Sequence, residues 1–179
     1  MYLLYPVCMW DIGLDPNSWI DDYFKNMILF KNINYNIIHR GDVIRIDEQS
    51  YVQFLLPVNE SQTENSSLAM KIVNGSNSIL FMDKLTDNDF QILLNDRELI
   101  KSDVLKMSHP KLIPSNFNEL IQFVDPKMTI ITGVRTKKNS PTPIELGEII
   151  DSELFFTDSV GAVWLYSDGK NQFEVKVWK

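Results

Sequence analysis

The stretch SILFMDKLTDNDFQILLNDRELIKSDVLKMSHP, residues 78–110, decides the fold of this chain. It begins with an apolar run, residues 79–82, that ends at Asp83, and it closes with a second run, residues 104–107, that is followed by Ser-His109-Pro. Short apolar runs bounded by turn signals are typical of buried strands, and two strands joined by a helix form a right-handed parallel unit. Both strands would end at the same edge of the sheet, where open α/β sheets place their sites. Asp83 and His109 are therefore the candidate functional residues.

Outward from this unit, the sequence predicts antiparallel strands before it and alternating helices and strands after it. Residues 41–57 alternate with a period near two around a polar turn, which indicates a hairpin, and the Asn74-Gly75 turn joins two further strands. Downstream, a helix with apolar residues at i, i+3, i+4 and i+7 is expected first. We therefore predict an α/β fold in which a mixed β-sheet is flanked by helices. The expected downstream elements are helix 115–124, strand 128–132, helix 143–150 and strands 154–157, 162–166 and 173–178.

The first 40 residues follow a different pattern. We predict that residues 1–40 form an extension and that residues 41–179 form the main domain. An apolar stretch within residues 2–10 indicates a strand, and Asp15-Pro16 has the residue types that begin helices. The apolar residues that follow recur at helical spacing, so we expect this helix to bury one face. Its aromatic side chains are either ordinary core packing or a protein interface, and the candidate interface residues are Trp19, Tyr23, Phe24 and Met27.

Composition excludes several classes of protein. The 179 residues carry a net charge of −7, which works against nonspecific binding to nucleic acid. The single cysteine, Cys8, excludes an internal disulfide framework. The chain has no run of about 18 apolar residues that would form a transmembrane helix, and its first six residues lack the basic region of a signal peptide. We expect a cytoplasmic protein that does not contact a membrane.

Most of the chain after residue 41 carries short motifs in a recognisable order. Phe-Met-Asp83 stands where the known pattern has Thr-Gly-Asp, and Asp-Val-Leu-Lys-Met-Ser-His109 stands where it has Asp-Val-Leu-Lys-Val-Pro-His. Asn-Ser140-Pro-Thr142-Pro takes the place of Gly-His-Pro-His-Pro, and a later Phe-Thr-Asp precedes a Gly-Ala as in the pattern. In this order the chain resembles the C-terminal half of a metallo-β-lactamase-fold domain, and most closely the hydrolase-like domain of ComEC-type competence proteins. The resemblance implies a partial metallo-β-lactamase-like fold, one αβ half of a parent that has two.

The resemblance also implies a metal site that this chain does not complete. Asp83 and His109 match two family ligands, whereas Ser140 and Thr142 replace the two loop histidines. The principal family motif, His-x-His-x-Asp-His, does not occur, and the one remaining histidine, His39, is expected in a turn. A catalytic zinc normally has three protein ligands, so two are too few. Asp83 and His109 are either structural relics or a metal contact that another chain completes.

Two functions follow from these observations. The first is a non-catalytic domain with a structural or protein-interaction role and no cofactor. The second is a fragment or subunit of a metal-dependent hydrolase, acting on phosphodiester or similar bonds with zinc or manganese. The predicted helices after residue 83 cover one side of the sheet and leave the other side to helix 19–28. We therefore expect a homodimer, or a separate protein partner, that covers the sheet.

Overall fold

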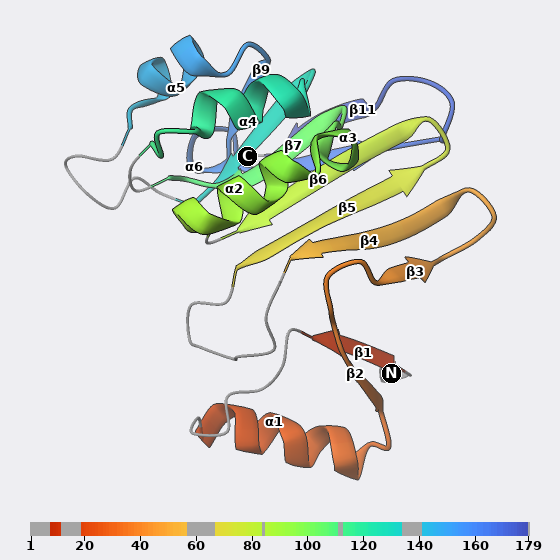
Figure 1. The fold of residues 1–179 in the computed structure, drawn as a ribbon. Helices are drawn as coiled ribbons and strands as arrows, with labels where there is room; N and C mark the ends of the chain where they lie inside the picture. Colours follow the sequence, from red (N-terminus) through yellow and green to blue (C-terminus); the bar gives the residue numbers. More distant parts are fainter. Residues whose placement is uncertain are drawn as a thin grey trace.

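A seven-stranded mixed sheet forms the main layer of the protein (Figure 1). The computed structural model describes residues 8–11, 19–56, 67–83, 85–110, 113–133 and 141–178. Within the sheet, β3 to β6 pair antiparallel, and β6 to β9 pair parallel. The α/β class and the parallel unit predicted from residues 78–110 are confirmed. In spatial order the strands are β3 (Val43–Arg45), β4 (Ser50–Leu56), β5 (Leu68–Asn74), β6 (Asn77–Asp83), β7 (Val104–Ser108), β8 (Met128–Thr132) and β9 (Glu153–Phe156).

Helices cover one face of this sheet (Figure 1). They are α2 (Asp87–Asn95), α3 (Arg97–Ile100), α4 (Phe117–Val124) and α5 (Pro143–Ile149). The predicted stripe of α4 is buried throughout, and Phe117 meets Phe90 of α2 edge to face, with ring centroids 6.2 Å apart. Alternate strand residues such as Leu80, Leu105 and Ile131 join the same core. The strand residues that alternate with a period of two and the helix residues that recur about every 3.6 positions thus pack into one apolar layer.

A hairpin formed by β10 (Ala162–Tyr166) and β11 (Glu174–Trp178) packs against the other face of the sheet. It follows β9 through the short helix α6 (Thr157–Val160). Half-buried residues of the hairpin, among them Leu165 and Val175, contact the buried Val104 and Met128. The expectation that this face would depend on helix 19–28 alone is wrong, because the last two strands of the chain fold back over the parallel part of the sheet.

The N-terminal residues form a separate unit that lies below the main sheet in Figure 1. It consists of β1 (Cys8–Asp11), α1 (Trp19–Phe30) and β2 (Asn34–Ile37), with β1 and β2 paired parallel. The expectation that α1 buries one face is wrong: Ile28 is its only buried residue. Two short strands offer too little surface to cover a helix of three turns. Strand β2 was not predicted. The predicted helix start at Asp15 and Pro16, and residues 2–7 of the predicted first strand, lie outside the described residues.

Candidate functional site

At the carboxyl ends of the parallel strands, the predicted site residue Asp83 lies next to Ser108, a partner that the sequence did not predict. Strand β6 ends at Asp83 and β7 ends at Ser108, and the parallel register places them side by side. The hydroxyl of Ser108 donates a hydrogen bond to the Asp83 carboxylate. Asp83 does not cap the following helix, because Thr86 does so with a capping box that includes Asp89.

His109 lies at the same edge, as predicted, and its hydrogen-bonding atoms lie against Thr132 and Pro110. Its main-chain N–H donates to the carbonyl oxygen of Thr132 at the end of β8, at 2.8 Å. Its ring Nδ1 lies 3.1 Å from the carbonyl oxygen of Pro110. The edge therefore gathers Asp83, Ser108, His109 and Thr132 from three consecutive parallel strands, all of them half-buried.

Asp83 and His109 supply two candidate metal ligands at this edge, fewer than the three protein ligands of a typical catalytic zinc site. Within the part of the chain that the structure describes, no three His, Cys, Asp or Glu side chains are grouped so as to hold an ion. Asp83 already accepts from a hydroxyl, and a hydroxyl or a carbonyl beside one histidine is a weaker donor set than zinc sites use.

The remaining sequence candidates have local roles. Thr142 caps α5: its hydroxyl oxygen accepts from the Glu145 N–H at 3.2 Å, and its own N–H donates to the Glu145 carboxylate at 2.6 Å. His39 is exposed in a turn, as expected, with Nδ1 3.5 Å from an oxygen of Asp42. Ser140 lies outside the described residues.

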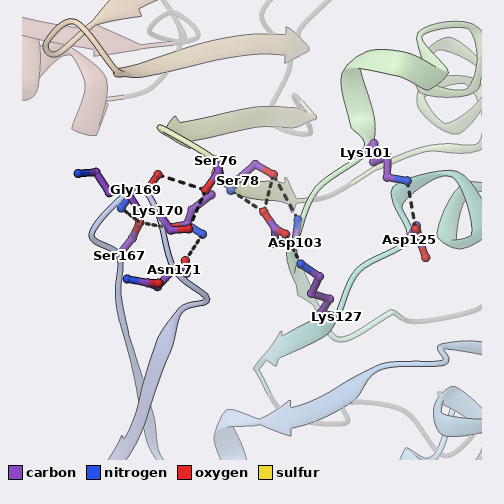
Figure 2. A network of polar contacts seen from close by, with 11 residues as sticks. Ser76, Ser78, Lys101, Asp103, Asp125, Lys127, Ser167, Gly169, Lys170 and Asn171 are labelled. Atoms are coloured by element: carbon purple, nitrogen blue, oxygen red, sulfur yellow. Dashed lines mark hydrogen bonds and ion pairs between the residues drawn. The ribbon is translucent and has the colours of Figure 1, made fainter.

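The opposite, amino-terminal edge of the parallel strands holds a polar network that the sequence did not predict (Figure 2). Asp103, directly before β7, accepts from the N–H and the hydroxyl of Ser78 at 2.9 and 3.1 Å. Lys127, directly before β8, donates to the other carboxylate oxygen at 2.9 Å. Burial raises the pKa of Asp103, but the hydrogen bonds from Lys127 and Ser78 outweigh it and hold this pKa below its ordinary value.

Two distant turns contact each other at this edge (Figure 2). The carbonyl oxygen of Gly169, between β10 and β11, accepts from the N–H of Ser76 at 2.8 Å, in the turn between β5 and β6. The side chain of Asn77 donates to the carbonyl oxygen of Asn171 at 2.7 Å, and Ser167 donates to the Asn77 side-chain oxygen at 2.6 Å. The contact anchors the terminal hairpin over the sheet. Both turns have turn-forming sequences, yet nothing local shows that they meet.

A cavity of about 370 Å³ lies between this anchor and the sheet. Asp103, Lys127 and Glu153 contribute its charged groups, and Met128 and Phe173 are among its apolar ones. Lys127 pairs with Asp103 within the chain, so these two residues together add no net charge to the cavity.

Aromatic side chains gather on two outer surfaces. On α1, the expected interface residues Trp19, Tyr23, Phe24 and Met27 are all exposed, with Trp19 at 78%. On the hairpin, Trp164, Tyr166 and Trp178 are exposed, and the antiparallel register places all three on the face turned away from the sheet.

No protein-family description matches the chain, and no curated protein matches it either. Among the described residues, no helix is long and apolar enough to cross a membrane. The class that the fold defines is therefore an α/β domain with a mixed sheet, helices on one face and a β-hairpin on the other.

Proposed function

We propose that this chain is a non-catalytic domain that acts by binding protein, and that it is a degenerate relative of the metallo-β-lactamase-fold hydrolases. The observation that supports a binding role is the exposed apolar surface of α1. Seven of its twelve residues are large apolar side chains in contact with water: Trp19, Ile20, Tyr23, Phe24, Met27, Leu29 and Phe30.

Such exposure is unusual for a helix on the surface of a monomeric protein. Contiguous apolar patches on soluble proteins mark contact surfaces, and Trp and Tyr are enriched among the residues that dominate binding energy. Burial of one large apolar side chain contributes about 1.5–3 kcal/mol. A partner that covers several of them therefore offsets the entropy that is lost on association.

Light scattering combined with a dye for exposed apolar surface tests the proposal. We expect the purified chain either to self-associate or to bind the dye. Trp19→Ser should lower the self-association or the dye binding that the wild type shows. Ile144→Ser, which removes an exposed side chain of α5, should leave both unchanged. A stable monomer that binds no dye would overturn the proposal.

The alternative proposal is a subunit of a metal-dependent hydrolase that uses zinc or manganese. The convergence of Asp83 and His109 at one sheet edge supports it. Metal analysis after dialysis against a chelator separates the two proposals. We expect no stoichiometric metal; one retained equivalent that is lost in His109→Ala would favour the hydrolase.

A further inference from the structure

The two turns that anchor the terminal hairpin each carry a dipeptide that can rearrange spontaneously. Asn74-Gly75 is the only Asn-Gly in the chain, and Asp168-Gly169 is the only Asp-Gly. Asparagine is a labile residue, and it is most labile before glycine, which has no side chain to shield its main-chain nitrogen. The contact between the N–H of Ser76 and the carbonyl oxygen of Gly169 therefore joins two such dipeptides.

Hydrogen bonds hold both reacting groups of Asn74-Gly75. The side-chain oxygen of Asn74 accepts from the hydroxyl of Ser50 at 3.1 Å, and its nitrogen donates to the hydroxyl and the carbonyl oxygen of Ser167 at 3.1 and 3.3 Å. The N–H of Gly75 donates to the carbonyl oxygen of Gln49 at 3.0 Å. Reaction requires this N–H to lose its proton and to turn toward the Asn74 side chain, so both sets of bonds must break first.

We propose that Asn74 is a deamidation site that the anchor protects, and that its conversion releases the terminal hairpin. The nitrogen of Gly75 attacks Cγ of Asn74, its proton leaves with the side-chain amide as ammonia, and a succinimide ring forms. One water molecule then opens the ring, which leaves aspartate or isoaspartate at position 74. This inference does not depend on the proposed binding function.

The partner turn is much less reactive. Ring closure at Asp168 would expel water from a protonated carboxyl group, but hydrogen bonds from the main-chain N–H groups of Asn171 and Lys170 hold the pKa of Asp168 at about 2. These bonds are 2.8 and 2.9 Å long. The carboxyl group is therefore ionised at neutral pH, and Asn74 is the residue that reacts first.

Either product would separate the two turns. Aspartate adds a negative charge and lacks the N–H donors that reach Ser167, so a carboxylate oxygen would face the carbonyl oxygen of Ser167. Isoaspartate adds a main-chain methylene next to Gly75, where one added carbon would already lie 2.2 Å from the carbonyl oxygen of Gly169. Without the anchor, half-buried apolar side chains such as Leu165 and Val175 are left to hold the hairpin on the sheet.

The rate of deamidation tests the protection. In peptide mapping by mass spectrometry of the full chain at neutral pH, Asn74 should convert much more slowly in the folded protein than in guanidinium chloride. Ser167→Ala removes a bond to Asn74 and one to Asn77, so it should raise the rate in the folded protein by roughly fivefold. Thr142→Ala, which removes the cap of α5, should leave the rate unchanged. Equal rates in the folded and unfolded chain, or a rate in Ser167→Ala no higher than in Thr142→Ala, would overturn the inference.

Hydrogen exchange tests the release of the hairpin. Asn74→Asp reproduces one product and should accelerate exchange in β10 and β11 while β6 to β8 stay protected. Asn34→Asp, at an exposed position of β2, adds the same charge outside the anchor and should leave exchange in the hairpin at the wild-type rate. If β10 and β11 exchanged equally fast in both variants, deamidation would not release the hairpin and the proposal would fail.

Discussion

The backbone at Gly75 leaves no room for a side chain. It has φ of +57°, and a Cβ there would lie 2.2 Å from the carbonyl oxygen of Gly169. This close approach lets the N–H of Ser76 reach the same oxygen. The contact between the two turns thus depends on the missing side chain.

Gly75→Ala should therefore lower the free energy of unfolding by about 2–3 kcal/mol. The matched control is Gly41→Ala, where φ is +91° but nothing lies within 4 Å of the added Cβ. There only the backbone strain remains, about 1–2 kcal/mol. Urea denaturation of both variants measures the difference, and equal losses would show that the approach to Gly169 is unimportant.

Asp103→Asn tests the network at the amino ends of the strands. Because hydrogen bonds hold the pKa of Asp103 below its ordinary value, its contribution is present at neutral pH and is lost as the pH falls from about 4 through the lowered pKa. We expect the variant to lose about 1–2 kcal/mol at pH 7.

The difference between wild type and Asp103→Asn should shrink as the pH falls below about 4, the ordinary pKa of Asp, and through the lowered pKa of Asp103. Thermal unfolding of both proteins across this range measures it. Subtracting the variant removes the contributions of other acids, such as Asp168, whose pKa is about 2 because its carboxylate accepts from Asn171 and Lys170. A difference that does not depend on pH would contradict the role given to the charge.

At the scale of elements, α5 shows how one side chain begins a helix. Thr142→Ala removes the cap of α5 and should cost about 1 kcal/mol, measured by chemical denaturation. Thr142→Ser keeps a hydroxyl at the same position and should retain most of the stability. If Ala and Ser were equally stable, the reciprocal bonds with Glu145 would contribute nothing.

Helix α1 shows the limit of periodicity as a signal. Its apolar spacing correctly predicts a helix, but spacing does not reveal whether a stripe is buried. Burial depends on what lies opposite, and among the described residues α1 has only the pair β1–β2 beside it in its own unit. Helix α4 has a similar stripe and buries it, because a seven-stranded sheet lies beneath it.

At the scale of the whole molecule, the terminal hairpin replaces the expected cover over the second sheet face. Leu165→Asp should place a charge between the two layers and cost about 2–3 kcal/mol. Hydrogen exchange should then accelerate in β10 and β11 while β6 to β8 stay protected. Trp164→Asp, on the outer face of the same strand, should leave exchange unchanged. Uniform acceleration throughout the sheet would show that the hairpin does not open separately.

The sequence by itself determined the elements whose signal is local. The apolar runs before Asp83 and His109, the cap at Thr86 and the stripe of α4 each lie within a few residues, so strand, helix and shared sheet edge could be predicted. Tertiary structure alone decided what those elements meet. The bond from Ser108 to Asp83, the contact of Ser76 with Gly169 and the exposure of α1 join or separate segments that are distant in sequence. A periodic pattern indicates that one face of an element is apolar. The tertiary arrangement of the chain decides whether protein or water covers that face.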